Sequence, residues 1–396
     1  MLNSETDANT IRRATYYPES TTYPHLRTRS TPPQSSSFGA SPAELASSPS
    51  SIITLIIIIV VVSTLNPAAP PLATTRPQHA MPPRPTFDEL PVRKDGPPGN
   101  AWGLYGDGDE CGTLNLLTPE RVARAAREIV HGVRVSTDWH LDSMSPPCFG
   151  RRSCEHTITH KAPMAVNDDE LRLNTQSSSQ WDGLRHFGYQ DEKLYYNGMS
   201  QDEVLSTHRN GIHAWVEKGG VVGRGVLLDY AAWADAKGLQ LKPLETVSIP
   251  VSALDQVAAS QGTTLQAGDI LFVRVGWTRE YQKQSPNERA ALASKESPPA
   301  MGLESSEETL RWIWDKELAA IAGDHPSMEA WPCQNMAFQL HPWLLAGWGM
   351  PIGELFDLER LSEECSKRQR WTFFFSSMPL KVPGGVASPP NGVAIF

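Results

Sequence analysis

Short apolar runs separated by polar turns predict a mixture of strands and helices from about residue 118 to the C-terminus. The clearest strand is 269–275, a continuous apolar and β-branched run that is typical of a strand buried on both faces. Shorter runs predict further strands at 133–137, 225–228, 318–322, 372–375 and 386–396. No internal repeat links these segments.

Three helices are predicted, two of them from the residues at their ends. Thr118 is an N-cap residue before an apolar helical pattern. Ser252 is predicted to begin a second helix with Asp255 as its capping partner, and Gly262 to end it. The third is predicted at 307–316. Because strands and helices mix without strict alternation, we predict a single α/β or α+β domain with a mixed sheet.

The first 80 residues differ in composition from the rest of the chain. Ser, Thr and Pro make up 33 of them, and such a segment buries too little apolar surface to form a core. We therefore predict a disordered extension over 1–80. Globular composition begins at Met81, so the predicted domain is 81–396, long enough for one well-buried core.

An apolar run at 52–65 bears on where the protein is located. It has 14 positions, three of them Ser or Thr, whereas a membrane-spanning helix needs about 20 apolar residues. We expect a cytoplasmic protein that does not bind membranes. The alternative is a membrane-anchored or secreted protein that uses this run as its signal.

Charge and motifs exclude several classes of function. The formal net charge is −9, with scattered acidic residues and no stripe of Lys and Arg, so nucleic acid is not an expected partner. Neither a GxGxxG nor a GxxxxGK[ST] loop is present, which argues against a nucleotide cofactor. The five cysteines form no CxxC pair and are expected to be free thiols.

Two pairs of residues could carry chemistry. Asp182 and His186 flank Gly183, and His341 and Glu354 follow far downstream in a stretch rich in Trp and Gly. Two carboxylates and two imidazoles that a fold brings together could hold a divalent metal or run acid–base catalysis alone. Each of these residues by itself would more often be structural or solvated.

The residues around Asp182 suggest a small-molecule substrate with an aromatic ring. Trp181, Phe187 and Tyr189 could wall an aromatic-friendly pocket, unless they belong to the core. Arg185 could bind an anionic group of the substrate.

Two other segments could contribute to a site. His156 and His160 have a spacing that binds zinc on a helix, but the intervening Thr-Ile-Thr favours a strand. We expect at least one of the two to line a pocket or to pack. The segment 324–327 follows a predicted strand and could be a functional loop or a plain turn. No GxSxG motif is present, which disfavours a serine hydrolase.

These residues resemble the cyclase family of metal-dependent hydrolases, which includes bacterial kynurenine formamidase and isatin hydrolase, and most closely its fungal cyclase-like branch. The family motif H-x-G-T-H-x-D-x-P-x-H aligns with 176–186. Asp182 falls on the motif's Asp and His186 on its last His, while His341 and Glu354 fall on the downstream His and Glu. The resemblance spans roughly 100–396 and implies a swivelling β/β/α domain that forms a homo-oligomer.

The chain departs from the motif at the metal ligands. Gln176 and Gln180 replace the first two histidines, and a neutral amide oxygen is a poorer zinc ligand than imidazole. The resemblance implies a divalent ion held by Asp182, His341 and Glu354 with help from the two glutamines. Such an oxygen-rich set suits Mn²⁺ or Mg²⁺ better than Zn²⁺, and the alternative is a metal-free site.

The function implied by the resemblance is hydrolysis of a carbon–nitrogen bond in a small aromatic amide or lactam. The class is arylformamidase-like, with N-formylkynurenine-type substrates of tryptophan catabolism. A metal would activate water and His186 would pass the proton to the leaving nitrogen, with Asp182 and Glu354 assisting. Without metal, His186 would be the base and Gln180 an oxyanion donor. The alternatives are a non-catalytic binding protein and a lactone-forming or ring-closing cyclase of secondary metabolism.

Overall fold

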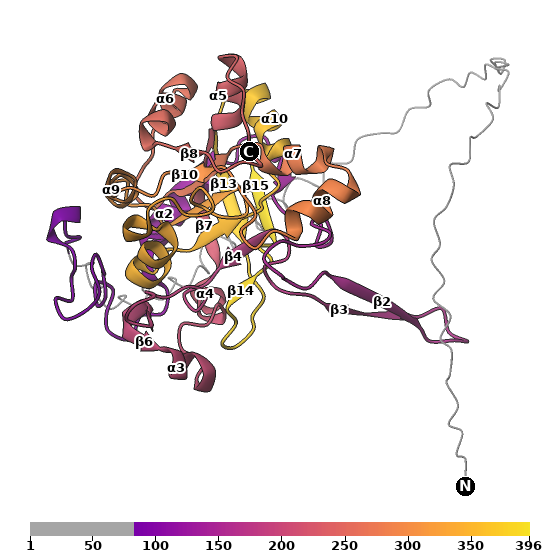
Figure 1. Ribbon diagram of the computed structural model, residues 1–396, viewed down its shortest axis with the longest axis horizontal. Coiled ribbons are helices and arrows are strands. Elements are labelled where there is room, and N and C mark those ends of the chain that lie inside the picture. Colours follow the sequence, from indigo (N-terminus) through magenta and orange to yellow (C-terminus); the bar gives the residue numbers. More distant parts are fainter. Residues whose placement is uncertain (1–82) are drawn as a thin grey trace, which may run out of the picture. The chain divides into compact units, whose positions relative to one another are not determined.

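A nine-stranded mixed sheet runs through the chain in the computed structural model, which describes residues 83–396 (Figure 1). The prediction of a mixed α/β or α+β fold is therefore confirmed. The predicted extension 1–80 and the apolar run 52–65 lie outside the described residues. Within 83–396, no helix is both long enough and apolar enough to cross a membrane.

The centre of the sheet is parallel and its two edges are antiparallel. Strands β7, β9, β11 and β12 run parallel, and every other neighbouring pair is antiparallel. In spatial order the strands are β1 (Arg134–Ser136), β15 (Gly392–Ile395), β13 (Thr372–Ser377), β7 (Val221–Asp229), β9 (Ile270–Arg274), β11 (Ala320–Gly323), β12 (Ile352–Glu354), β4 (Gln180–Asp182) and β14 (Ala387–Ser388).

Helices and shorter elements connect and cover these strands. The α-helices are α2 (Pro119–Ala125), α3 (Gln201–Ser206), α4 (His213–Lys218), α5 (Tyr230–Ala236), α6 (Val251–Gln261), α7 (Trp277–Lys283), α8 (Pro286–Ala293), α9 (Glu307–Asp315) and α10 (Glu359–Arg368). A π-helical turn, η6, spans Pro342–Trp348, and 3₁₀ turns are η1 (Phe87–Glu89), η2 (Gly112–Leu116), η3 (Ala126–Glu128), η4 (Tyr196–Gly198) and η5 (Met336–Phe338). Two-stranded ladders pair β8 (Ser248–Ile249) with β10 (Gly302–Leu303) and β5 (Leu194–Tyr195) with β6 (Met199–Ser200).

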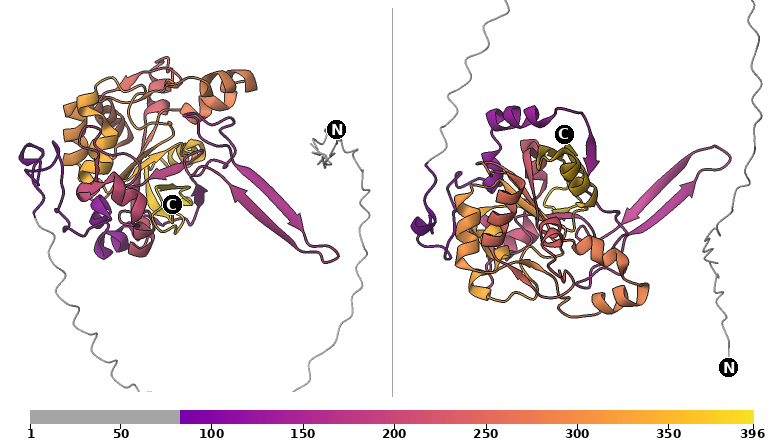
Figure 2. Two further views of the ribbon diagram at one scale, coloured as in Figure 1. Left: turned by 60° about the horizontal axis from the view of Figure 1, so that its bottom comes forward. Right: turned by 90° about the horizontal axis from the view of Figure 1, so that it is seen from above.

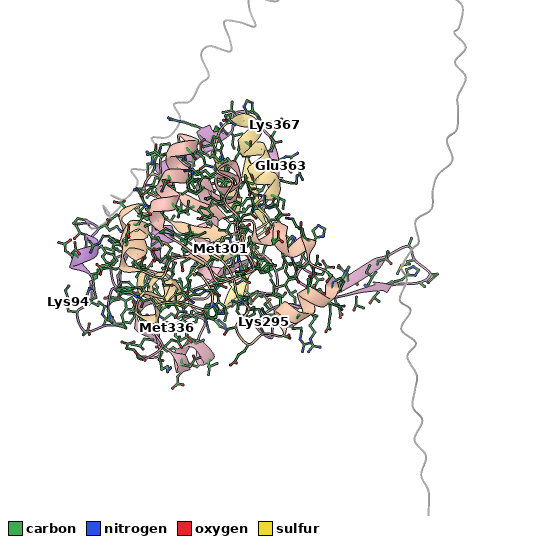
Figure 3. The ribbon with its side chains drawn as sticks, turned by 45° about the horizontal axis from the view of Figure 1, so that its top comes forward. Lys94, Lys295, Met301, Met336, Glu363 and Lys367 are labelled. Carbon is green, nitrogen blue, oxygen red and sulfur yellow. The ribbon has the colours of Figure 1, made fainter. Side chains whose placement is uncertain are left out.

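The core lies on both faces of the sheet. Along β9, Leu271 and Val273 belong to one buried apolar cluster, which α6, α7 and α9 complete. Ile270 and Phe272 belong to the other cluster, which includes residues of α4 and α10. This alternation explains the continuous apolar run of β9, because a strand covered on both faces has no polar side. Charged side chains such as Lys295 and Lys367 lie at the periphery (Figure 3).

Of three helix boundaries predicted from capping residues, two agree with the structure and one does not. Thr118 caps α2 by accepting a hydrogen bond from the Arg121 N–H, and Gly262 ends α6 in a left-handed conformation. The start of α6 differs from the prediction, because Pro250 rather than Ser252 is the N-cap. Asp255 forms no capping box and instead accepts from the indole of Trp312.

A hairpin of β2 (Glu155–His160) and β3 (Asn167–Arg172) extends away from the body of the domain (Figures 1 and 2). All of its strand residues are exposed. His156 and His160 lie on a strand, as predicted, but neither lines a pocket or packs, so that expectation was wrong. His156 pairs with Asp169, and His160 contacts the carbonyl of Met164.

Replacing Phe272 with alanine should destabilise the domain by about 3–5 kcal/mol, because a fully buried ring would leave a cavity. Phe272 lies in the central strand and contacts Phe356, Phe373 and Phe375 edge-on or tilted. Urea denaturation of the full chain measures the change. Leu205→Ala, at a side chain that is 79% exposed, is the control and should change stability by less than about 0.5 kcal/mol. An equally small change for Phe272→Ala would contradict this assignment of the core.

Candidate functional site

The pairing of β4 with β12 positions the acidic residues of the site. In this antiparallel ladder Gln180 lies opposite Glu354, and Asp182 lies opposite Ile352. Residues directly opposite each other share one face of the sheet, so the side chains of Gln180, Asp182 and Glu354 point the same way. All three are fully buried. Residues more than 170 positions apart in the chain are thereby brought together.

His341 enters the site from the residue before η6 and is held by a carboxylate that the sequence did not reveal. Its Nδ1 lies 2.8 Å from Oε2 of Glu329, and its Nε2 lies 3.3 Å from Oε1 of Glu354. Glu329 is completely buried and fixes the orientation of the ring. No spacing or motif in the sequence links Glu329 to His341.

Gln180 links the two acids. Its amide nitrogen lies 2.8 Å from Oε2 of Glu354 and 3.2 Å from Oδ1 of Asp182. The amide oxygen faces the guanidinium of Arg151 at 3.3 Å. The reverse orientation would set oxygen against carboxylates and nitrogen against a cation, so the hydrogen bonds fix which way this amide points.

Gln176 also presents an amide nitrogen to the site. This nitrogen lies 2.7 Å from Oδ1 of Asp182 and 3.2 Å from the ring of His186. Gln176 and Gln180 thus both donate to carboxylates. Their implied role as oxygen ligands of a metal stays a prediction.

Burial and the neighbouring charges shift the pKa values of the ionisable groups in different directions. Burial lowers the pKa of His186, and the charge of Asp182 offsets this only in part. Burial would also lower the pKa of His341, but Glu329 and Glu354 outweigh it and raise that pKa well above its usual range. Burial and the charge of Asp182 raise the pKa of Glu354 to about 7. His186 is thus neutral near pH 7, whereas His341 carries a charge between two acids.

The donor set fits a divalent cation. Asp182, His186 and His341 each offer one ligand atom, and these atoms all lie within 4.8 Å of one another. Glu354 adjoins His341 Nε2 and supplies a further oxygen. A histidine whose other nitrogen is held by a buried carboxylate, as His341 is by Glu329, is the usual arrangement of a metal-binding imidazole.

A cavity of about 190 Å³ opens next to these groups. Its lining residues are Phe149, Arg151, His186, Phe187, Pro326, Ser327, Trp331, Gln339, His341 and Glu354. The rings of Phe149 and Trp331 meet edge to face, and the ring of Phe187 lies 5.4 Å from that of His341. The cavity therefore joins an aromatic wall to the ionisable groups, which suits a small molecule with a planar ring.

Of the four residues predicted to bind substrate, only Phe187 lines this cavity. Trp181 points to the opposite face of β4, packs on Phe356 and donates to Ser377, because neighbours along a strand face opposite sides. The guanidinium of Arg185 donates hydrogen bonds to backbone carbonyls within 204–209. Tyr189 is buried and donates to the carbonyl of Pro98, beside a different cavity.

The first half of the segment 324–327 has a structural role, and its second half lies at the cavity. The buried carboxylate of Asp324 accepts from the backbone N–H groups of Val275, Gly276 and Trp277, which ties the loop after β9 to the loop after β11. Ser327 lines the cavity. The alternative of a plain turn therefore holds for the first half of the segment only.

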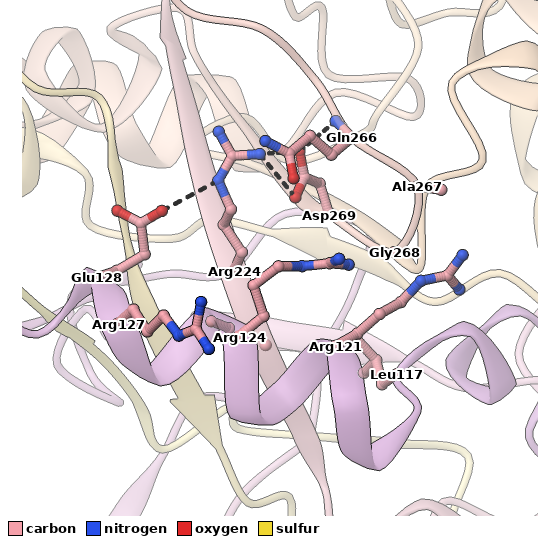
Figure 4. A pocket seen from close by; sticks show the side chains of 12 residues that line it. Leu117, Arg121, Arg124, Arg127, Glu128, Arg224, Gln266, Ala267, Gly268 and Asp269 are labelled. Atoms are coloured by element: carbon pink, nitrogen blue, oxygen red, sulfur yellow. Dashed lines mark hydrogen bonds and ion pairs between the residues drawn. The ribbon is translucent and has the colours of Figure 1, made fainter.

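A second cavity, of about 220 Å³, lies beside α2 and the start of β9 (Figure 4). Arg121, Arg124 and Arg127 surround it, and Arg224 forms ion pairs there with Glu128 and Asp269. Its lining contains no histidine, cysteine or serine. Its two carboxylates, Glu128 and Asp269, are both paired with Arg224, so the combination of histidines with carboxylates is found at the first cavity.

Comparisons with known proteins agree with this fold. Residues 112–330 match the family model described as "Putative cyclase". The crystal structure of a protein described as a novel cyclase is 31% identical, with a TM-score of 0.67, and the alignment covers 75% of this chain and 99% of that one. No curated protein sequence gave a significant match.

Two more distant structures are similar over most of their length. Isatin hydrolase A from Labrenzia aggregata, bound to benzyl benzoate, is 16% identical with a TM-score of 0.47, covering 71% of this chain and 98% of that one. A protein described as a predicted metal-dependent hydrolase from Bacillus stearothermophilus is 13% identical with a TM-score of 0.39, covering 67% and 98%. Both are too distant to indicate an activity for this chain.

Replacing His341 with alanine should weaken the binding of Mn²⁺ by more than the 10- to 100-fold that is typical for loss of an outer-shell partner, since a direct ligand is removed. Calorimetric titration of the full chain with Mn²⁺ measures this. His156→Ala removes an exposed histidine outside the site and should leave the affinity unchanged.

The same titration should show that the wild-type affinity rises between pH 6 and pH 8. A cation must displace the proton that Glu329 and Glu354 stabilise on His341, so binding weakens as the pH falls. Equal affinities for wild type and His341→Ala, or an affinity that is independent of pH, would show that His341 is not a ligand.

Proposed function

The chain belongs to the cyclase family, and on this basis we propose that it is a hydrolase that opens a carbon–nitrogen bond of a small aromatic amide or lactam. The observation that carries the proposal is that His186, His341 and Glu354 line one cavity with an aromatic wall, while the buried Asp182 lies close to the two histidines. An arylformamidase-like reaction on an N-formylkynurenine-type substrate fits the size and character of this cavity.

His186 is the residue proposed to move protons. It lines the cavity, it is the most exposed of the four groups, and its lowered pKa leaves the imidazole free to accept a proton near pH 7. Asp182 Oδ2 lies 3.8 Å from its Nε2 and stabilises the imidazolium that forms. Unlike His341, His186 has no carboxylate holding its second nitrogen, which favours an acid–base role over a ligand role.

The proposed hydrolysis needs only water and the side chains at the site. Water adds to the acyl carbon and gives its proton to His186. The carbon–nitrogen bond then breaks and His186 returns the proton to the leaving nitrogen, so that a carboxylic acid and an amine are released. Asp182, His341 and Glu354 would hold a divalent ion, which when bound would polarise the acyl oxygen and acidify water.

A metal-free version of the same reaction is the second candidate. The hydrogen bonds of Gln180 favour it, because its amide already satisfies both Asp182 and Glu354 without a cation. In this version Gln180 would have to turn an N–H group away from a carboxylate before it could donate to an oxyanion.

Other features of the protein are proposed from the resemblance and from the sequence. We propose a homo-oligomer, as the resemblance implies, and a cytoplasmic location with no nucleic-acid or membrane partner, on the grounds of charge and the short apolar run. A ring-closing or lactone-forming cyclase and a non-catalytic binding protein remain the alternatives, and the screen below distinguishes them.

Replacing His186 with alanine should lower kcat for hydrolysis of aryl formamides and small lactams roughly 10²- to 10⁴-fold, because proton transfer is lost. The screen uses the full chain, with and without a chelator, and includes lactones and open-chain hydroxy acids. His156→Ala is the matched control and should retain full activity. Turnover of lactones or hydroxy acids alone would favour the cyclase alternative. A ligand that binds but is never turned over would favour the binding protein.

Replacing both Gln176 and Gln180 with histidine should tighten zinc binding by at least several-fold, because imidazole nitrogen suits Zn²⁺ better than an amide does. Zinc affinity and activity are measured together on the purified variant. If the wild type needs a metal, exhaustive chelation abolishes its activity. Full wild-type activity after chelation, with no metal found by elemental analysis, would overturn the metal version and leave the metal-free one.

A further inference from the structure

The anion-binding role expected of Arg185 has a different candidate at the cavity. Arg151 is the one arginine or lysine among the residues that line it. We propose that Arg151 binds an anionic group of the substrate, so that the enzyme selects aromatic amides or lactams that carry a carboxylate. The part of this inference that concerns hydrolysis rests on the proposed function, whereas the binding of an anion by Arg151 does not.

The backbone before Arg151 is arranged to present side chains to the cavity. Phe149 and Gly150 both have positive φ values, 58° and 64°. Glycine adopts this conformation readily, but a bulky aromatic residue does so rarely and at a cost. Strained residues of this kind are concentrated at binding sites. Here the turn directs Phe149 and Arg151 to the same cavity.

Part of the guanidinium is anchored and part remains free. One terminal nitrogen of Arg151 donates to the carbonyl of Gln176 at 2.8 Å and faces the amide oxygen of Gln180 at 3.3 Å. Within 83–396 no acidic side chain forms an ion pair with Arg151. Its carbon Cζ lies 5.2 Å from the centre of the Phe149 ring, which steadies the side chain further. An anchored, unpaired guanidinium is suited to bidentate pairing with a carboxylate.

The other groups of the cavity define the rest of the ligand. Phe149, Phe187 and Trp331 offer aromatic surface for a ring, and Pro326, Ser327 and Gln339 are uncharged. Glu354 contacts the opposite side of the Gln180 amide and would repel an anion from its own side. A carboxylate would therefore bind on the guanidinium side of Gln180, where Arg151 is the one arginine or lysine of the lining.

Binding of benzoate to the full chain tests the inference without any turnover. Calorimetric titration should show benzoate binding more tightly than benzyl alcohol, a neutral compound of similar size. Arg151→Gln should weaken benzoate binding roughly ten- to a hundredfold, the range expected for a charge-assisted pair, and should leave benzyl alcohol unaffected. Arg152→Gln is the matched control, because Arg152 does not line the cavity and lies 3.9 Å from Glu155.

Arg151→Lys keeps the charge but loses the planar fork, and it should fall between wild type and Arg151→Gln. Thermal denaturation verifies that each variant folds. Benzoate binding that is equal in the wild type and in folded Arg151→Gln would overturn the proposal, and so would equal binding of benzoate and benzyl alcohol by the wild type, a test that needs no variant.

Hydrolysis separates anion binding from transition-state stabilisation. N-formylanthranilate and formanilide share the same reacting bond, but only the first carries a carboxylate. Arg151→Gln should raise KM roughly ten- to a hundredfold for N-formylanthranilate only. A fall in kcat for both compounds would assign Arg151 to the developing oxyanion and overturn the proposal. If benzoate binds through Arg151 but no amide is hydrolysed, the proposed hydrolase function fails while this inference stands.

Discussion

The antiparallel register between β4 and β12 is the constraint on which the site depends. It sets Glu354 opposite Gln180 and sends Trp181 to the other face, opposite Gly353. A side chain at Gly353 would collide with Ala322, Phe356 and Trp181, because an added Cβ would lie 2.6–2.9 Å from their atoms. A shift by one residue would turn Gln180 and Asp182 towards the apolar core on the other face and turn Trp181 towards the site. Core packing and the position of the acids are therefore fixed by the same pairing.

Several acids buried at one point need compensation, and the structure shows how it is supplied. Asp182, Glu329 and Glu354 are all almost fully buried, where unpaired charges are costly. His341 lies between Glu329 and Glu354 as a cation, and the amides of Gln176 and Gln180 donate to Asp182 and Glu354. A divalent ion would replace this compensation rather than add to it, because His341 must first release its proton. Proton and metal thus compete for the same site.

The sequence revealed those parts of the fold and site that depend on local patterns or on the motif. The buried run of β9 and the Thr118 cap are local features and were predicted. Asp182, His186, His341 and Glu354 could be named because each falls on a position of the family motif.

The missed features depend on contacts that no short segment specifies. Trp181 and Arg185 were expected at the cavity because they neighbour Asp182 in sequence. Alternation along β4 turns Trp181 to the other face, and Arg185 donates to backbone carbonyls about 20 residues downstream. Glu329 and Arg151 reach the site through tertiary contacts with His341 and Gln180. The start of α6 was misplaced because Pro250, whose fixed φ suits the beginning of a helix, competes with Ser252 as the cap.

The amide at position 180 explains how the site differs from the histidine-rich motif it resembles. A glutamine offers two N–H donors and an acceptor oxygen, so Gln180 contacts both carboxylates and Arg151 at once. A neutral imidazole has one donor and one acceptor and could not meet three partners. Replacing histidine with glutamine thus weakens a potential metal ligand, but it connects the two acids of the site to the arginine at the cavity wall. Arg151 and the two acids therefore share one hydrogen-bonding partner at the site.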